Sequence, residues 1–293
     1  MPLITVILPT RDRGGVLPRA VASVLAQTEP DWELLIIDNN RKEAPVAAGQ
    51  FPGGGVADPR LQVLPAPQAK NAAAARNAGL ATARGKWIAY LDDDDAYRPE
   101  KLRCQLALAE RAASPLVLCG AEFHLRGRTR RAQCGTPEWR GEDLLLRARW
   151  NTSLLFHRHP GELRFDETLD AGEDGEFAHR FLAAAGASAV PVAALPLVDV
   201  YQDAAAALRT NLRGEAGWRA ARRIWRQFGK KYPPSARRLF VLRACITRAK
   251  LRGDWRKVAR LGTGLLCLGP EQWRFGLNAL FLSLGWFPGR WVS

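Results

Sequence analysis

The sequence predicts an α/β protein with a mostly parallel sheet flanked by helices, followed by a basic α-helical C-terminal subdomain. Three observations lead to this prediction. Short apolar runs alternate with helical patterns, acidic residues directly follow two of these runs, and basic residues are concentrated near the C-terminus. Of the 293 residues, 47% are hydrophobic and 25% are charged, which excludes disordered, collagenous and disulfide-scaffold proteins.

Each predicted strand is a short run of apolar and β-branched residues ended by proline or turn-forming residues, as Pro9 ends the first. Each predicted helix spaces its apolar residues three or four positions apart, as Val21, Val24 and Leu25 are spaced in the first. In chain order the expected elements are a strand over 3–8, a helix over 17–27, strands over 32–37 and 60–64, a helix over 70–83, a strand over 87–91, a helix over 99–113 and a strand over 116–119.

The connections between these elements are predicted from their composition. Residues 43–55 are rich in Ala, Pro and Gly and are expected to form a loop. Gly85 is expected to cap the C-terminal end of the Ala-rich helix, and Pro99 is expected to open the helix after the fourth strand. Because the elements alternate as βαβ units do, a ligand is expected beyond the carboxyl ends of the strands.

Acidic side chains are predicted at that edge of the sheet. Asp38 follows the second strand, and the four consecutive residues Asp92–Asp95 follow the fourth. Adjacent carboxylates repel one another, and hard oxygen ligands suit Mg²⁺ or Mn²⁺, so this run predicts a divalent-cation site. The alternative is a solvated acidic turn, which the position of the run at the end of a buried strand disfavours.

Six motifs resemble, in order, those of the family 2 inverting glycosyltransferases, and a later pair of segments resembles that family's acceptor-side motif. The six motifs are residues 6–10, 22–28, 33–38, 75–79, 83–95 and 99–102, and the later segments are residues 165–167 and 172–174. The resemblance covers about residues 3–200. It implies the GT-A fold, a nucleotide-sugar donor (a UDP-sugar above all), a hydroxyl acceptor, Mn²⁺ or Mg²⁺, and inversion at the anomeric carbon.

The resemblance also implies roles for individual residues around the donor. Pro9, Thr10 and Asp38 line the nucleotide pocket, Arg76 lies near the nucleotide and its phosphates, Asp92 and Asp93 lie towards ribose and phosphate, and Asp94 binds the metal. The family often has an acidic residue where this chain has Asn39, which leaves the donor base open. Two alternatives stay open: Arg76 is an ordinary surface residue of a helix, and Asp95 caps the following turn.

Asp174 is the candidate general base on the acceptor side. An acceptor hydroxyl must lose its proton as it attacks the sugar, and a carboxylate within hydrogen-bond reach can take that proton. Asp174 lies in a glycine-bearing loop that leads into a predicted helix, so the alternative is that it caps the helix N-terminus. Glu173 is expected to hold the local structure or to orient the acceptor.

The net charge of +14 is concentrated at one end of the chain. Residues 1–203 carry 24 Lys and Arg against 26 Asp and Glu, whereas residues 204–293 carry 19 against 3. The strand pattern also ends near residue 200. We therefore predict a nucleotide-sugar-binding catalytic domain over 1–203 and a basic helical subdomain over 204–293. Its helices are expected over 215–228, 235–252 and 255–267.

The basic helices interleave Arg with Trp, which leaves three interpretations open: docking on an anionic membrane surface, nucleic-acid binding, and a solvated helical subdomain with Trp in its core. The resemblance favours the membrane surface over nucleic acid, by analogy with enzymes that act on lipid-linked saccharides. Five scattered cysteines and an N-terminus that reads as a strand predict a cytoplasmic protein. With the membrane-surface interpretation of the basic helices, the protein is expected to be peripheral on the inner face of the membrane.

The expected function is transfer of a sugar to a hydroxyl acceptor in cell-surface polysaccharide or glycolipid synthesis. One alternative is a nucleotidyltransferase, which needs a basic triphosphate-binding loop that residues 11–15 resemble only faintly. A second alternative is a catalytically inactive binding module with the same fold. The presence of both Asp94 and Asp174 argues against such a module, since a scaffold needs neither carboxylate.

Overall fold

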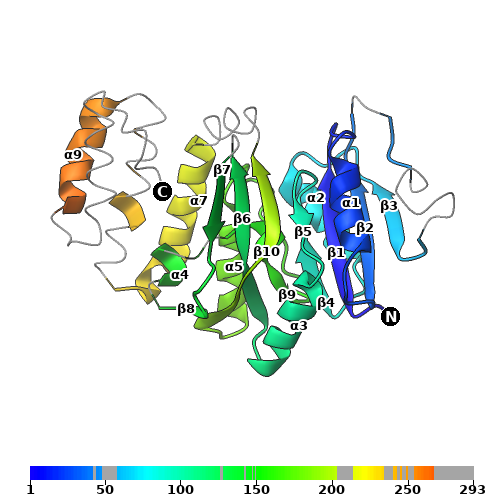
Figure 1. The fold of residues 1–293 in the computed structure, drawn as a ribbon. Helices are drawn as coiled ribbons and strands as arrows, with labels where there is room; N and C mark the ends of the chain where they lie inside the picture. The colour runs from blue at the N-terminus through cyan, green and yellow to red at the C-terminus, as the bar shows by residue number, and fades with distance from the viewer. Residues whose placement is uncertain are drawn as a thin grey trace. The chain divides into compact units, whose positions relative to one another are not determined.

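The computed structural model places the chain in two compact units, Met1–Ala206 and Ala207–Ser293 (Figure 1). It describes residues 1–41, 44–47, 58–125, 128–141, 143–146, 148, 150–202, 214–233, 240–242, 245, 249 and 254–266. Most of the predicted loop over 43–55 and most of the predicted helix over 235–252 lie outside the described residues. The functional division at residue 203 stays a prediction.

The first unit is an α/β structure built on one mixed sheet. Its strands are β1 (Ile4–Thr10), β2 (Trp32–Asp38), β3 (Leu61–Pro65), β4 (Trp87–Tyr90), β5 (Ala96–Tyr97), β6 (Leu116–Leu125), β7 (Arg128–Ala132), β8 (Glu138–Arg140), β9 (Phe156–Arg158) and β10 (Ala189–Gln202). Its helices are α1 (Leu17–Leu25), α2 (Ala72–Thr82), α3 (Lys101–Arg111), α4 (Asp143–Leu146), the 3₁₀ turn η2 (Thr152–Leu154) and α5 (Glu173–Ala184).

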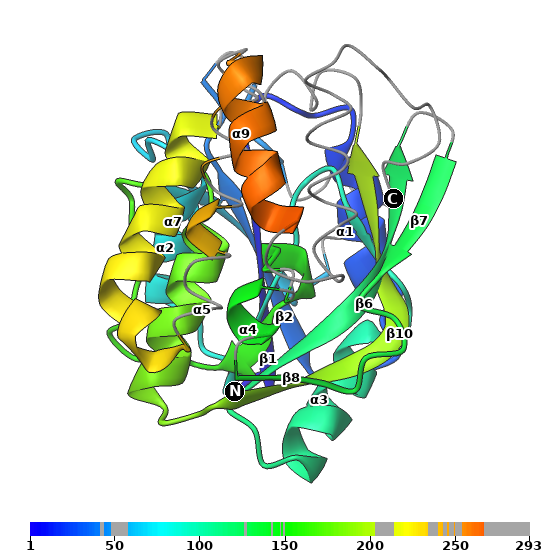
Figure 2. The same cartoon turned by 90° about the vertical axis from the view of Figure 1, so that its left-hand side faces the viewer.

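The strand order is β3-β2-β1-β4-β9-β6-β10-β5, with β7 paired to β6 and β8 paired to β10. Strands β1 to β4 are parallel, as the alternating pattern predicts. Strand β9 enters antiparallel between β4 and β6 (Figure 1). Strands β6 and β10 are again parallel to each other and lie side by side in both views (Figures 1 and 2). The predicted α/β class is confirmed, and the carboxyl ends of β1, β2 and β4 meet at one edge.

Strands β1, β2 and β4 form the centre of the core because almost every residue in them is buried. Helix α2 packs closely on β1 and β2 because Gly79 has no side chain: a Cβ there would lie 2.6 Å from the side chain of Ile7. The N-cap of helix α2 is Asn71, whose side chain accepts a hydrogen bond from the backbone N–H of Ala74. This packing fixes the orientation of α2 and therefore the position of Arg76.

The expected C-cap at Gly85 is wrong. Helix α2 ends at Thr82, its cap residue is Ala83, and Gly85 lies in the extended segment before β4. A Cβ on Gly85 would lie 2.4 Å from the backbone nitrogen of Thr5, so glycine is needed for close approach to β1 and not for a helix cap. The close contact brings β4, and the acidic run after it, against β1.

The second unit contains α7 (Gly214–Phe228), the 3₁₀ turn η3 (Gly229–Lys231) and α9 (Trp255–Leu266) among its described residues. Helices α7 and α9 match two of the predicted helices. In α7 the residues Ala220, Ile224 and Phe228 are buried, while Arg222 and Arg226 are exposed. Among the described residues, we find no helix with the length and apolar character needed to cross a membrane.

Candidate active site

The carboxyl ends of β1 and β2 bring two of the predicted donor-binding residues together. Thr10 and Asp38 are register partners at the last position of the parallel pair, and both are buried. The carboxylate of Asp38 accepts hydrogen bonds from the backbone N–H groups of Asn40 at 2.9 Å and Val46 at 2.8 Å. Asp38 therefore shapes the loop that follows β2, and Pro9 precedes Thr10 within the same strand.

Asp93 and Asp94, which lie in the acidic run after β4, contact side chains from the end of β1 and from the loop after it. Thr10 Oγ1 donates to the carboxylate of Asp93 at 2.9 Å. Nη1 of Arg13 lies 2.8 Å from Asp93 Oδ1 and 2.7 Å from Asp94 Oδ2. Burial and the neighbouring carboxylates raise the pKa of both Asp93 and Asp94, although Arg13 opposes that shift. The two carboxylates thus converge on one cationic group.

Arg76 joins the acidic run to the helix that carries the candidate base. Its Nη2 donates to Asp92 Oδ1 at 2.7 Å, and its Nη1 donates to Glu173 Oε1 at 2.9 Å. The residue is 3% exposed, so the alternative of an ordinary surface arginine is wrong. Burial disfavours the charged guanidinium, but Asp92 and Glu173 outweigh that effect and raise the pKa of Arg76.

Asp95 has a structural role that differs from the expected turn cap. Its carboxylate accepts hydrogen bonds from Ser153 Oγ at 2.8 Å and from the backbone N–H of Tyr201 at 3.2 Å. Ser153 Oγ also lies 3.2 Å from the backbone nitrogen of Asp92, which donates to it. Asp95 therefore ties the acidic run to η2 and to β10, whereas the carboxylates of Asp92, Asp93 and Asp94 contact Arg76 and Arg13.

Asp174 lies in the first turn of α5 and is not its cap. The N-cap position belongs to Gly172, whose φ of 75° is a left-handed conformation that favours glycine. The carboxylate of Asp174 accepts a hydrogen bond from the backbone N–H of Gly175 at 2.7 Å. Burial and the adjacent charge of Glu173 raise the pKa of Asp174 to about 8. This value suits a group that accepts a proton near neutral pH.

The residues at this edge fit a magnesium or manganese ion whose ligands are carboxylates of the protein and oxygens of a substrate phosphate. The structure brings Asp93 and Asp94 into range of a single cation, since one guanidinium nitrogen lies within 2.8 Å of both carboxylates. In the part of the chain that the structure describes, no group of three His, Cys, Asp or Glu residues could hold a metal by itself. One or two carboxylates completed by substrate phosphates are the usual arrangement for Mg²⁺.

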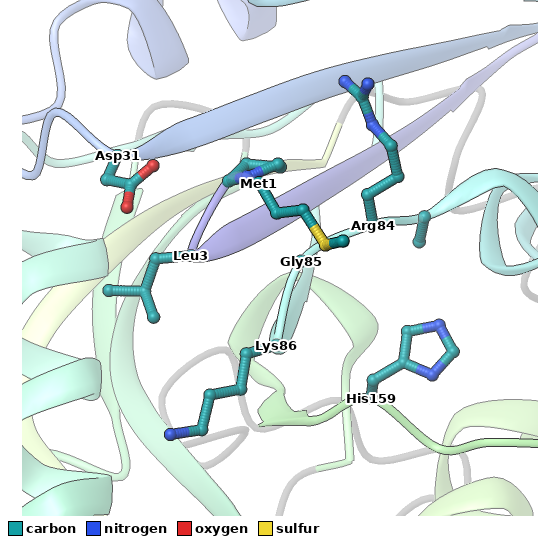
Figure 3. A pocket seen from close by; sticks show the side chains of 9 residues that line it. Met1, Leu3, Asp31, Arg84, Gly85, Lys86 and His159 are labelled. Atoms are coloured by element: carbon teal, nitrogen blue, oxygen red, sulfur yellow. The ribbon is translucent and has the colours of Figure 1, made fainter.

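A pocket of about 510 Å³ lies at the opposite edge of the sheet. It is lined by Met1, Pro2, Leu3, Asp31, Ala83, Arg84, Gly85, Lys86 and His159 (Figure 3). His159 follows the antiparallel strand β9, the other lining residues precede β1, β2 or β4, and Arg84 is already paired with Glu33 at 2.6 Å. The pocket is therefore separate from the acidic run.

The family profile described as Glycosyl transferase family 2 matches residues 5–167, more than half of the chain. The chain belongs to glycosyl transferase family 2. The matched segment includes almost all of β1 to β4, Arg76 and the whole acidic run, which are the residues predicted to bind the donor. It ends before α5, and the role of Asp174 is therefore not covered by this match.

Two curated relatives show the kinds of protein that this family 2 chain is similar to. The succinoglycan biosynthesis protein ExoO of Rhizobium meliloti is 30% identical over 208 residues, which are 65% of this chain and 58% of ExoO. The Escherichia coli protein named UDP-Glc:alpha-D-GlcNAc-diphosphoundecaprenol beta-1,3-glucosyltransferase WfgD is 34% identical over 106 residues, 36% of this chain and 40% of WfgD. The chain thus matches about half the length of these relatives.

Two solved structures show the fold. Residues 1–349 of S. aureus TarS in complex with UDP-GlcNAc give a TM-score of 0.62 at 14% identity, covering 97% of this chain and 89% of that one. The mannosyltransferase PcManGT of Pyrobaculum calidifontis, in complex with GDP-Man and Mn²⁺, gives 0.54 at 17% identity, covering 97% and 86%. The predicted GT-A fold of this family 2 chain is confirmed.

Most of the predicted family 2 site residues lie along one edge in two groups. One group links Thr10 with Asp93 and, through Arg13, with Asp94, and the other links Asp92 with Glu173 through Arg76. Pro9 and Asp38 flank the first group, and Asp174 follows Glu173 in the second.

Four residues that contact these groups were not among the predicted site residues. They are Arg13, Arg19, Thr152 and Ser153. The sequence signal for Arg13 is its place in residues 11–15, the loop after the first strand that faintly resembles a basic triphosphate-binding loop. The two hydroxyl residues lie in a 3₁₀ turn that no apolar period marks.

Proposed function

We propose that this chain transfers a sugar from a UDP-sugar to the hydroxyl of a lipid-linked saccharide, with inversion at the anomeric carbon, in the synthesis of a bacterial cell-surface polysaccharide. One observation carries the proposal. Buried Arg76 bridges Asp92 of the donor-side run and Glu173, the neighbour of Asp174 on the acceptor side. The acidic run on the donor side is thus connected, through Arg76 and Glu173, to Asp174, the carboxylate whose pKa is raised.

The residues divide the reaction between them. Asp174 takes the proton from the acceptor hydroxyl as its oxygen attacks C1 of the sugar, and the bond from C1 to the departing diphosphate breaks in the same displacement. Arg76 fixes the first turn of α5 relative to the acidic run because it is bonded to both. Thr10 orients Asp93, and Ser153 orients Asp95 and the backbone of Asp92.

Asp94, with Asp93 beside it, would hold Mn²⁺ or Mg²⁺. A bound divalent cation supplies charge neutralisation for the leaving diphosphate. This assignment is supported by the convergence of the two carboxylates and by the neighbour PcManGT, whose structure is in complex with GDP-Man and Mn²⁺. The donor and acceptor are supported in the same way, by the UDP-GlcNAc complex of TarS and by the name of WfgD, which specifies UDP-Glc and a diphosphoundecaprenol acceptor.

A release assay tests the function. The full chain is incubated with a panel of UDP-, GDP- and dTDP-sugars and Mn²⁺ or Mg²⁺, and the freed nucleoside diphosphate is measured. We expect release from at least one UDP-sugar, faster with a saccharide acceptor present. Binding of UDP-sugars without any release would favour the inactive binding module, and release of pyrophosphate from a nucleoside triphosphate would favour a nucleotidyltransferase.

The pH dependence of kcat/KM should show a base with a raised pKa. Asp174 accepts a proton only when ionised, and its pKa is raised from 3.8 to about 8. The rate should therefore climb as pH rises from about 5 to about 8 and level off above that. Initial rates in a constant-ionic-strength buffer series measure the profile. A rate already at its plateau near pH 5 would contradict the assignment of this group.

We also propose that the basic helix α7 docks on an anionic membrane surface at the cytoplasmic face. Each Arg close to such a surface contributes on the order of 1 kcal/mol, and salt weakens the attraction. The full chain should sediment with anionic vesicles at low salt, release at high salt, and ignore neutral vesicles. Replacing Arg219, Arg222, Arg223 and Arg226 with Gln should weaken sedimentation, whereas the same four changes to Lys should not.

Two outcomes would contradict membrane docking. An oligonucleotide that binds more tightly than the anionic vesicles at equal salt would indicate nucleic acid as the partner. The absence of binding to either probe at low salt would leave α7 as part of a solvated helical subdomain. The Gln variant should turn over a small soluble acceptor at the rate of the unmodified chain in either case.

A further inference from the structure

Arg13 contacts two carboxylates of the acidic run with a single nitrogen. Nη1 lies 2.8 Å from Asp93 Oδ1 and 2.7 Å from Asp94 Oδ2. The side chain of Asp93 is 7% exposed, and those of Arg13 and Asp94 are 30% exposed, so solvent screens these contacts only in part. The attraction of the two carboxylates outweighs the effect of burial and raises the pKa of Arg13, which is charged at every working pH.

A divalent cation bound to Asp94 needs the oxygen atoms that Arg13 holds. Mg²⁺ binds carboxylate oxygens at about 2.0–2.1 Å, and a guanidinium cannot share that space with the ion. Two positive charges within a few ångströms also repel each other strongly where solvent is scarce. We propose that Arg13 is a built-in competitor of the metal: its guanidinium occupies the metal position in the nucleotide-free protein. The inference rests on the proposed metal site at Asp94.

The backbone around Arg13 is held while its side chain is free to change partner. Asp12 donates its backbone N–H to Asn40 Oδ1 at 2.6 Å, and its carboxylate accepts from the backbone N–H of Arg41 at 2.8 Å. The loop after β1 is therefore fastened to the loop after β2, and a shift at Arg13 stays within its long side chain. A guanidinium displaced from carboxylates finds equivalent acceptors in the oxygens of a diphosphate.

This competition couples the metal to the nucleotide. In the free protein the ion has to displace the Arg13 guanidinium from its carboxylates, and no phosphate is present to accept the hydrogen bonds of that guanidinium. We therefore expect weak metal binding. When a nucleoside diphosphate is present, the displaced guanidinium gains phosphate oxygens and the metal gains phosphate ligands. Metal and donor should therefore bind with positive cooperativity, and removal of the Arg13 charge should reduce that cooperativity.

Manganese binding tests the proposal without any turnover. The electron paramagnetic resonance signal of free Mn²⁺ is titrated with the full-length chain, with and without UDP, and Mn²⁺–UDP mixtures lacking protein correct for metal held by the nucleotide. Without UDP, Arg13→Gln and Arg13→Ala should bind Mn²⁺ at least about fivefold more tightly than the unmodified chain. Arg11→Gln removes the same charge from an exposed position of the same loop and should stay within about twofold.

The outcomes separate this proposal from the proposed function. Equal affinities for the Arg13 and Arg11 variants, or weaker Mn²⁺ binding when Arg13 is replaced, would overturn the competition while leaving the metal site intact. A failure of every folded variant to bind Mn²⁺ even with UDP would overturn the metal site itself. Melting temperatures of the variants show which are folded, and two neutral replacements guard against a new hydrogen bond from Gln to Asp93.

Discussion

Asp174→Asn is expected to lower kcat by about 10²–10⁴, the usual contribution of a positioned general base. Asparagine keeps the size of the side chain and its hydrogen bond with the backbone N–H of Gly175, but it cannot accept the proton of the acceptor. The affinity for the donor should stay within about twofold because the donor-side residues are untouched. Single-turnover rates and UDP-sugar titrations measure the two quantities separately.

The melting temperature of Asp174→Asn is a second test of Asp174 as the general base. The pKa of Asp174 is raised in the folded state. Between pH 4 and about 8, the folded protein therefore keeps this carboxyl group protonated, whereas the unfolded chain has lost the proton. Stability therefore falls as pH rises through that range, and removing the ionisable group should leave the melting temperature at pH 8 equal or higher. Asp170→Asn, an exposed aspartate four residues earlier, is the matched control. A large loss of stability with little kinetic change would contradict the base assignment.

Asp94→Ala is expected to lower transfer by about 10³-fold or more, since a bound cation contributes several kcal/mol to stabilising the leaving diphosphate. Excess EDTA should do the same to the unmodified chain, and added Mn²⁺ should restore only the unmodified chain. The side chain of Asp94 is 30% exposed and Asp95 holds the run to η2 and β10, so the fold should persist. Glu110→Ala on the exposed side of α3 is the control. Full activity in excess EDTA would contradict the metal site.

The sequence predicts strands β1, β2 and β4 and the residues that end them well because their signals are local. The apolar runs of β1, β2 and β4 and the turn-forming or acidic residues that end them occur within a few positions of one another. The parallel pairing then places Thr10 beside Asp38 and brings the acidic run to the same edge. The predicted roles of Asp94 and Asp174 depend on the family resemblance, because composition alone assigns no role to either carboxylate.

The second half of the sheet is much harder to predict. Strand β9 has three residues, and β10 contains Pro191 and Pro196, which argue against a strand flanked on both sides. The structure accommodates the prolines through irregular register between Ala193 and Val198. No periodicity rule anticipates such a strand.

Long-range contacts are equally invisible to sequence patterns. Arg13 and Asp93 are 80 positions apart, and Arg76 and Glu173 are 97 apart. Each pair is brought together by the tertiary fold and not by spacing along the chain. Gly85 shows the same limit, because its glycine serves a close approach to Thr5 on another strand, whereas the local pattern suggested a helix cap.

The stereochemistry of the first product tests the central claim most directly. With an α-linked UDP-sugar, Mn²⁺ and no acceptor other than water, proton nuclear magnetic resonance follows the anomeric signal of the released sugar before mutarotation. A single in-line displacement with Asp174 as base predicts that the β-anomer appears first, together with UDP. First appearance of the α-anomer would show retention and would contradict this assignment of Asp174.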